Sequence, residues 1–361
     1  MDAEKILVRG VNWLGDAVMT LPALRRLREA KPDAHVAILT PEKLAEVWED
    51  QSIVDEVIEI GPAETLWGVG RRLRAERFDI AVAFPNSMRS AVELWLSGAR
   101  RRIGAAGAPR SLLLTDAVEP HPGAVKMRKR SEGQIRRALE QGTAAQGIST
   151  AAHHAHQYLH LTARLGASEQ PIAPQLAVSG GDVESALAKF ALERNGLRWG
   201  LAPGGEYGPA KRWPRERFVE AAAALQKQVH CQWLVFGGQG DVDAAGWVAD
   251  GIRRACGADA AVNLAGRTRL RELMALLSAC KMVLTNDTGP MHLAAALGVR
   301  VVAIFGSTSP ELTGPIFSAS ASIVRSPPPC SPCFRRDCPV DLRCLNGVGS
   351  NEVIRAVLRG M

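Results

Sequence analysis

The sequence lacks the features that mark membrane-spanning, secreted and nucleic-acid-binding proteins. It has no apolar run of about 18 residues, which argues against a transmembrane helix, and no basic N-terminal region followed by an apolar stretch and a cleavage site. Aromatic residues make up only 5% of the composition and do not alternate with the basic runs, so a stacking platform for single-stranded nucleic acid is not expected. We therefore expect a cytoplasmic protein with no transmembrane segment and no nucleic acid partner.

Common cofactor motifs are missing as well. The first strand-to-helix turn does not have GxGxxG spacing, and after Gly238-Gln239-Gly240 the third glycine position holds Asp243, so a dinucleotide-dependent dehydrogenase is not indicated. Lys211 lacks the GK[ST] context of a P-loop. His156 and His160 have the i, i+4 spacing of helical metal ligands, but without an HExxH pattern they indicate a metal only weakly.

Two further patterns contain metal-ligating residues. Asp241-Val242-Asp243 matches the DxD pattern of some metal-dependent glycosyltransferases, but it falls in an expected first helical turn, where acids favour the helix dipole. Four thiolates could bind one zinc ion, although their spacing is not a repeated CxxC pair, and free thiols or disulfides are the alternatives. We expect no metal requirement, with a structural zinc as the alternative at the clustered cysteines Cys330, Cys333, Cys338 and Cys344.

The composition is that of a globular α/β protein. The 361 residues are 47% apolar and 22% charged, enough for roughly two domains with separate cores. A net charge of +7 suits acidic small molecules or an anionic lipid surface.

Alternating strands and helices predict a parallel, doubly wound sheet in each half of the chain. The expected strands are 4–9, 35–40, 56–60, 79–84, 197–202, 232–236, 261–264, 282–284 and 299–305, and the expected helices are 17–30, 41–49, 64–74, 87–96, 152–165, 182–195, 215–229, 241–256, 269–279, 290–297 and 351–358.

This pattern predicts two Rossmann-like domains that face a central cleft, where two substrates could meet. The Pro/Gly-rich stretch 171–181 is the expected linker. The predicted parts are an N-terminal domain 1–170 with a basic, mobile insert at about 126–150, a C-terminal domain 182–345 with a Cys-rich loop 330–344, and a C-terminal helix within 346–361.

The stretch Lys281–Phe305 predicts an anion site. It has the pattern strand, tight turn, helix and strand, and the turn Asp287-Thr288-Gly289 opens the helix at the carboxyl end of a parallel strand. Free N–H groups and the positive end of the helix dipole favour phosphate there. An ordinary structural crossover is the alternative, since many such turns bind nothing.

A second candidate for binding an anion is the glycine loop Ala202–Pro214, which ends in Lys211-Arg212 before a helix. Flexible backbone followed by a cation suits a diphosphate, whereas a solvated surface loop is the alternative. Gly205 of this loop, together with Gln239 after the next strand, completes the candidate ligand-binding residues of the second half.

Candidates for contact with a second substrate follow strands of the first half. Asp16 lies at the start of the first helix, either as a helix cap or as a carboxylate at a strand's carboxyl end, where general bases are found. Asn12 precedes it, and Asn86-Ser87 follow a later strand, as a substrate contact or a capped helix start. The basic run Lys126–Arg137, which contains Arg128 and Arg130, is either a solvated face or a patch for a phosphorylated or membrane-embedded substrate.

Together these segments resemble the ADP-heptose:lipopolysaccharide heptosyltransferases of glycosyltransferase family 9, which have the two-Rossmann GT-B fold. The likeness spans the chain except for the basic insert, and the FPNS and GPAKRWP segments look most like the heptosyltransferase II branch. The matching segments are NWLGDAVMTLPAL from Asn12, FPNSMRSA from Phe84, APGGEYGPAKRWP from Ala202, NLAGRTRLRELMALLSAC from Asn263 and TNDTGPMHLAAALG from Thr285.

The resemblance implies an inverting transfer of L-glycero-D-manno-heptose from ADP-heptose to a heptose of a Kdo-lipid A acceptor at the inner membrane face, with no cofactor. Asp16 would be the general base, and Lys211 with the amides at Thr288-Gly289 would stabilise the leaving diphosphate. Asp287 and His292, from the DTGxxH pattern, would contact the donor. Alternatives are heptosyltransferase I, a non-catalytic nucleotide-sugar binding protein and a nucleotide-sugar epimerase.

Overall fold

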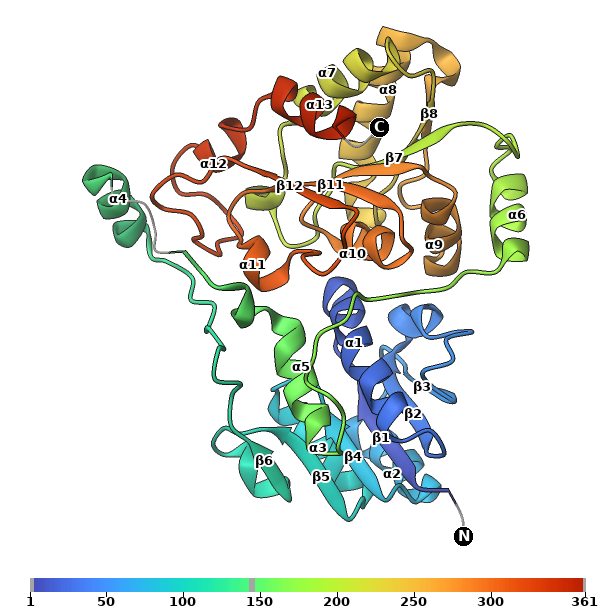
Figure 1. Cartoon of the computed structure of the whole chain (residues 1–361), viewed down its shortest axis with the longest axis vertical. Coiled ribbons are helices and arrows are strands. Elements are labelled where there is room, and N and C mark those ends of the chain that lie inside the picture. The colour runs from blue at the N-terminus through green and yellow to red at the C-terminus, as the bar shows by residue number, and fades with distance from the viewer. Residues whose placement is uncertain (1–2, 143–146, 360–361) are drawn as a thin grey trace. The chain divides into compact units, whose positions relative to one another are not determined.

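The computed structural model describes residues 3–142 and 147–359, and the chain divides into two compact units (Figure 1). The first unit comprises residues 1–124 and 151–177, and the second comprises 125–150 and 178–361. The basic segment, which we expected as an insert of the N-terminal domain, therefore groups with the second unit. Within the described residues no helix is both long enough and apolar enough to cross a bilayer.

The first unit is built on a parallel sheet with the strand order β3-β2-β1-β4-β5-β6. The strands β1, β2 and β4 are largely buried along their length, as expected for a sheet that has helices on its faces. Its elements in chain order are β1 (Lys5–Arg9), α1 (Leu14–Ala30), β2 (His35–Pro41), η1 (Glu42–Val47), β3 (Glu56–Ile60), α2 (Leu66–Glu76), β4 (Ile80–Ala83), α3 (Met88–Ser97), β5 (Arg101–Ala105), η2 (Arg110–Leu113), β6 (Asp116–Val118) and α5 (His154–Ala163), with η3 (Thr150–Ala152) at the unit boundary.

Helices α2 and α3 pack on one another and cover one face of this sheet. Val69 and Leu73 of α2 and Leu94 of α3 are fully buried against side chains of the central strands, among them Leu7 and Leu39. These apolar positions recur at helical spacing on the helices and at every second residue on the strands, which is why one face of each element is buried.

The second unit repeats this architecture with the strand order β12-β11-β10-β7-β8-β9, again all parallel. Its elements in chain order are α4 (Glu132–Gln141), α6 (Gly180–Lys189), β7 (Arg198–Ala202), η4 (Pro209–Lys211), α7 (Arg215–Gln226), β8 (Gln232–Val235), η5 (Gln239–Asp241), α8 (Val242–Cys256), η6 (Ala258–Ala260), β9 (Ala261–Asn263), α9 (Leu270–Ser278), β10 (Met282–Asn286), α10 (Gly289–Ala296), β11 (Arg300–Phe305), α11 (Pro310–Thr313), β12 (Ala321–Arg325), α12 (Arg343–Asn346) and α13 (Ser350–Leu358).

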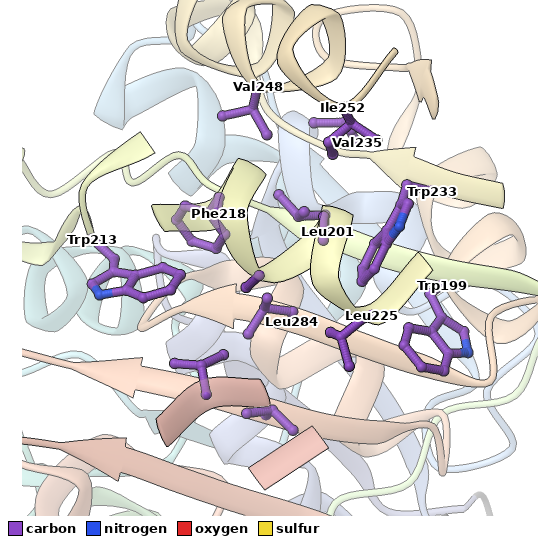
Figure 2. Close-up of a cluster of buried hydrophobic side chains, with 14 of the residues drawn as sticks. Trp199, Leu201, Trp213, Phe218, Leu225, Trp233, Val235, Val248, Ile252 and Leu284 are labelled. Atoms are coloured by element: carbon purple, nitrogen blue, oxygen red, sulfur yellow. The ribbon is translucent and has the colours of Figure 1, made fainter. Parts of the chain in front are cut away.

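Aliphatic and aromatic side chains together fill the core of the second unit (Figure 2). Trp199 and Trp233, from neighbouring strands, meet edge to face with ring centroids 5.4 Å apart. Trp213 meets Phe218 of α7 in the same way at 4.9 Å. The indole of Trp213 also donates to the carbonyl of Val348, at 3.0 Å, so the glycine loop that precedes it ends on a fixed, buried anchor.

In both sheets the strand order reverses next to the first strand of the unit. The reversal lies between β1 and β4 in the first unit and between β7 and β10 in the second. In open α/β sheets, ligands bind at the carboxyl ends of the strands at such a switch point. The predicted acceptor-side loops follow β1 and β4, and the predicted donor-side loops follow β7 and β10, so the topology places each set at a switch point.

The α/β class and the doubly wound sheets are confirmed, and a few elements differ from expectation. The expected helix 41–49 is the shorter 3₁₀ helix η1. Strands β5, β6 and β12 were not anticipated. They are short or lie toward sheet edges, and they contain charged residues, as is common where a strand must avoid pairing with other chains. Their apolar signal is correspondingly weak.

Candidate active site

The donor-side candidates of the second unit gather around the first turn of α10. The helix begins at Gly289, and Thr288 is its N-cap residue with extended backbone and no side-chain cap bond. Pro290 occupies the first turn, as the sequence predicted. The amide groups of this turn are therefore available to an anion at the carboxyl end of β10.

A buried ion pair joins the two loops of the switch point. Lys211 Nζ lies 2.6 Å from Asp287 Oδ2, and the hydroxyl of Thr308 donates to the same oxygen at 2.6 Å. Asp287 is 4% exposed. The ammonium also lies 5.0 Å from the centre of the Tyr207 ring. Lys211, the cation proposed for the diphosphate, is thus held at the end of β10 by the Asp287 carboxylate. The Thr308 hydroxyl, in the loop after β11, fixes that carboxylate.

His292 lies one turn into α10 and is buried. Burial lowers the pKa of its imidazole to about 4; the Asp287 carboxylate opposes this shift and the Lys211 ammonium adds to it. The ring is therefore neutral near pH 7. A neutral imidazole can donate one hydrogen bond and accept another, which suits contact with a sugar hydroxyl better than a charge would.

Asp241 organises the glycine loops. Its carboxylate accepts from the backbone N–H of Gly205 at 3.1 Å and of Gly238 at 3.2 Å, and it lies 3.4 Å from the Arg212 guanidinium. A Cβ on Gly204 would fall 2.2 Å from its Cγ, so this close approach requires glycine. The hydrogen bond to Asp241 thereby fixes Gly205 in the loop that also carries Lys211.

Gln239, the remaining donor-side candidate, lies in η5 after β8. Its side chain reaches Gly266 after β9: a Cβ on that glycine would lie 2.8 Å from Oε1. Gln239 therefore lines the same carboxyl edge of the sheet, beyond the loops that carry Lys211 and Asp287.

Asn286 and Thr308 were missed by sequence reasoning. Asn286, at the end of β10, donates to the carbonyls of Pro203 and Gly204 at 2.7 and 3.0 Å and accepts from the Trp213 N–H at 3.1 Å. It thereby ties the glycine loop to the anion-binding turn. For Asn286 the available signal was an amide side chain at the end of an otherwise apolar strand. For Thr308 there was none, because nothing in the sequence pairs it with Asp287.

In the first unit, Asp16 occupies the first turn of α1, and the N-cap position belongs to Trp13, which makes no side-chain cap bond. The cap interpretation of Asp16 is therefore wrong. Tyr158 of α5 is buried, and burial together with the nearby Asp16 carboxylate raises the pKa of its phenol well above the ordinary value. Asp16 is half-buried at the carboxyl end of β1, where a base for a bound hydroxyl could act.

A buried ion pair supports the turn that carries Asn12. Arg9 Nε lies 2.7 Å from Glu93 Oε2, and both side chains are buried. The same guanidinium donates to Asn12 Oδ1 at 3.1 Å and to the carbonyl of Gly10. The β1 loop is thus fixed from α3, a link between distant segments that the sequence did not indicate.

The loop after β4 combines a structural and an exposed polar residue. Ser87 caps α3 by accepting from the Ser90 N–H at 3.2 Å, so the capped-helix interpretation holds for its hydroxyl. Asn86 is exposed beside it. The buried Arg110 guanidinium donates to the carbonyls of Pro85 and Ala105, which fixes this loop to β5.

Arg128 and Arg130 do not belong to the unit that carries Asn12 and Asn86. Arg128 is exposed. Arg130 is bound to the Cys-rich loop: its N–H donates to the carbonyl of Cys333 at 3.0 Å and its guanidinium to that of Pro329 at 3.2 Å. Of the two arginines, Arg128 is the one whose charge is presented to solvent.

The clustered cysteines line one small cavity, together with Ile135 of α4 and Ser307. All four are free thiols, and burial raises the pKa of Cys344 to about 12, so that thiol is protonated at neutral pH.

The histidines of the first unit form a second cluster. The ring of His121, which follows β6, stacks on that of His156 with centroids 5.5 Å apart and meets that of His160 edge to face at 5.6 Å. Across residues 3–142 and 147–359, no three His, Cys, Asp or Glu side chains are arranged to hold a metal ion.

Comparison with known proteins identifies the family. The model of the family described as glycosyltransferase family 9 (heptosyltransferase) matches residues 66–343. Lipopolysaccharide heptosyltransferase 2 of Escherichia coli (strain K12) is 33% identical over 334 residues, which cover 89% of this chain and 88% of that protein.

Solved structures share the fold. The structure of E. coli ADP-heptose lps heptosyltransferase II has a TM-score of 0.77 at 27% identity and covers 98% of this chain and 97% of its own. E. coli heptosyltransferase WaaC, solved with ADP-2-deoxy-2-fluoro heptose, has a TM-score of 0.69 at 18% identity, covering 99% and 100%. The family model spans well over half of the chain, and the chain therefore belongs to glycosyltransferase family 9, the heptosyltransferases.

Proposed function

We propose that this glycosyltransferase moves L-glycero-D-manno-heptose from ADP-heptose to a heptose of the lipopolysaccharide inner core, with inversion at the anomeric carbon. The observation that carries the proposal is the buried pair of Lys211 and Asp287 at the switch point of the second sheet, beside the first turn of α10. The similarity to lipopolysaccharide heptosyltransferase 2 supports the sugar and the acceptor.

Donor binding is assigned to the second unit. The diphosphate would lie against the N–H groups of Thr288 and Gly289, where the helix dipole favours negative charge. Lys211 would turn from its carboxylate toward the diphosphate, and Asp287 and His292 would then be available to heptose hydroxyls. Because the imidazole of His292 is neutral, it can bind a heptose hydroxyl without placing a charge beside the diphosphate.

The transfer is a single displacement. The acceptor hydroxyl oxygen attacks the anomeric carbon, its proton passes to the Asp16 carboxylate, and the bond from the anomeric carbon to the ADP oxygen breaks. Attack opposite to the leaving group inverts the configuration. A positioned base typically contributes about 10²–10⁴-fold, and Lys211 with the α10 amides would stabilise the charge that develops on the diphosphate.

The acceptor side is assigned to the carboxyl edge of the first unit. Asn12, held by Arg9, and the exposed Asn86 would bind acceptor sugars. The exposed Arg128 would contact phosphates of a Kdo-lipid A acceptor at the inner membrane face. The proposal requires that the donor and the acceptor are bound at the same time, and it requires no metal.

Mass analysis of the product tests this function. ADP-heptose is supplied with two defined lipopolysaccharide acceptors, one that ends in Kdo and one that already carries a single heptose. We expect the mass to rise by one heptose on the second acceptor only. Transfer to the Kdo acceptor instead would assign the first heptose transfer, and tight donor binding without ADP release would identify a binding protein.

A further inference from the structure

The Cys-rich loop is bound to the glycine loop of the donor site. The backbone N–H of Ala210 donates to the carbonyl of Arg336 at 2.9 Å, and the hydroxyl of Tyr207 donates to the carbonyl of Phe334 at 2.7 Å. A Cβ on Gly208 would lie 2.8 Å from the Arg336 carbonyl oxygen, so the two backbones approach as closely as a glycine permits. Main-chain contacts therefore fix the position of Arg336 relative to the glycine loop.

The Cys-rich loop also holds the turn after β11. The N–H groups of Cys333 and Phe334 donate to the carbonyl of Ser307, at 3.1 and 2.8 Å. Ser307 precedes Thr308, whose hydroxyl binds the Asp287 carboxylate. Phe334 has a φ of 54°, in the left-handed region that is uncommon for a residue with a side chain. Such a backbone persists only where the surrounding contacts impose it, so this loop is a rigid part of the donor site.

The loop presents a cation beside Lys211. The guanidinium of Arg336 lies 5.3 Å from the centre of the Tyr207 ring, and Lys211 Nζ lies 5.0 Å from the same centre. Arg336 is exposed, and within residues 3–142 and 147–359 no carboxylate forms an ion pair with its side chain. Its charge is therefore available to a ligand that reaches Lys211.

Other cations of the two loops are already bound. Lys211 shares its charge with Asp287, and Arg212 lies 3.4 Å from the Asp241 carboxylate. The guanidinium of Arg335 donates to backbone carbonyls. The diphosphate of a nucleotide sugar carries a negative charge on each phosphate, which a partly neutralised lysine does not balance alone. Charge balance therefore calls for a further cation at the donor site, and the exposed guanidinium supplies it.

We propose that Arg336 binds the diphosphate of the donor together with Lys211. A guanidinium offers paired N–H groups that match two oxygens of a phosphate, which an ammonium group does not. The Tyr207 ring attracts both cations and so keeps them on the same part of the site. A donor phosphate is favoured over an acceptor phosphate because the Arg336 backbone is bonded to the loop that carries Lys211. The inference rests on the proposed function, in which the second unit binds ADP-heptose.

Calorimetry with ADP and with adenosine tests this contact on the full chain without any acceptor. We expect R336Q to bind ADP about tenfold more weakly than the unchanged chain, because a charge-assisted hydrogen bond to phosphate is lost. Its affinity for adenosine should not change. R336K keeps the charge but loses the paired donors, so its ADP affinity should lie between the two. The contacts of position 336 with the glycine loop are made by its backbone, and thermal unfolding of R336Q should therefore match that of the unchanged chain.

Arg343 provides a matched control on the same loop. It is exposed and pairs with Asp341 at 2.9 Å, so R343Q removes one positive charge without removing a donor contact. R343Q should bind ADP like the unchanged chain. Equal ADP affinity in R336Q, an equal loss in R343Q, or an equal loss of adenosine affinity in R336Q would each overturn the proposal.

Kinetics separate this inference from the proposed function. In R336Q the KM for ADP-heptose should rise, whereas the KM for the acceptor at saturating donor should not change. A raised acceptor KM with unchanged ADP affinity would place the contact on an acceptor phosphate and contradict the donor assignment. If ADP binds but no acceptor is glycosylated, the proposed function fails while calorimetry still decides the role of Arg336. If the unchanged chain does not bind ADP, both are wrong.

Discussion

The buried pair of Lys211 and Asp287 gives the most direct test of the donor site. In Lys211→Met the carboxylate of Asp287, 4% exposed, loses its ion-pair partner and keeps the hydrogen bond from the Thr308 hydroxyl. Removing one member of a buried pair typically costs about 3–5 kcal/mol. The lysine side chain is 14% exposed, so we expect a loss near the lower value, about 3 kcal/mol.

A double variant separates stability from catalysis. In K211M/D287N no unpaired charge remains, and Thr308 can still donate to the amide oxygen at position 287. We expect the double variant to be more stable than the sum of the single changes predicts, by at least about 1 kcal/mol. Its kcat should not recover, because the cation that stabilises the leaving diphosphate is absent, a loss of about 10²–10³-fold.

Urea unfolding followed by circular dichroism measures the first effect, and initial rates of ADP release measure the second. Lys281, exposed before β10, supplies the control: K281M should change stability by less than about 0.5 kcal/mol and leave the rate unchanged. If K211M unfolds like the unchanged chain, the pair is not a buried charge pair. If K211M keeps its kcat, the role in diphosphate departure is wrong.

Four other predictions address single parts of the site. Asp16→Asn should keep its affinity for ADP-heptose in calorimetry and lose about 10²–10⁴-fold in kcat; a fully active variant would contradict the base assignment. His292 has a folded pKa of about 4, below its unfolded value of 6.5, so its contribution of about 3 kcal/mol is complete above pH 6.5 and is lost as pH falls toward 4. His292→Gln should therefore flatten the acid side of the stability profile, and an unchanged difference between pH 7 and pH 5 would contradict this. Gly204→Ala should weaken donor binding measured by calorimetry, because the added Cβ would meet the Asp241 carboxylate at 2.2 Å; unchanged binding would show that the loop can shift freely. Arg128→Ser should raise KM for a lipid acceptor but leave ADP-heptose binding unchanged, and equal acceptor kinetics would dismiss that contact.

The sequence was most informative where chemistry and local structure coincide. The TNDTGP segment combines a strand end, capping residue types and a proline in the first helical turn, and α10 begins there as expected. The glycine loop before Lys211 was found by its composition. By contrast, the Thr308 bond to Asp287 and the Arg9 bond to Glu93 join residues far apart in the chain. No local pattern encodes which distant side chains meet.

The same reasoning explains the errors. Asp16 was weighed as a helix cap because acidic residues favour that position, yet the helix begins two residues earlier and Trp13 holds the cap position. The basic segment looked like an insert of the first domain because it follows that domain in the chain. The bonds from the Arg130 backbone N–H to Cys333 and from its guanidinium to Pro329 group it with the second unit.

The sequence by itself determined the α/β class, most strand and helix positions and the residue types of the donor turn, because periodicity, capping and glycine content act over a few residues. Tertiary structure alone decided which strands are neighbours, and hence that the loops after β7 and β10 share one switch point. It also decided that Lys211 meets Asp287 in a buried site. The physical reason is that burial and pairing depend on contacts between distant segments, whose free energy no single stretch of the chain contains.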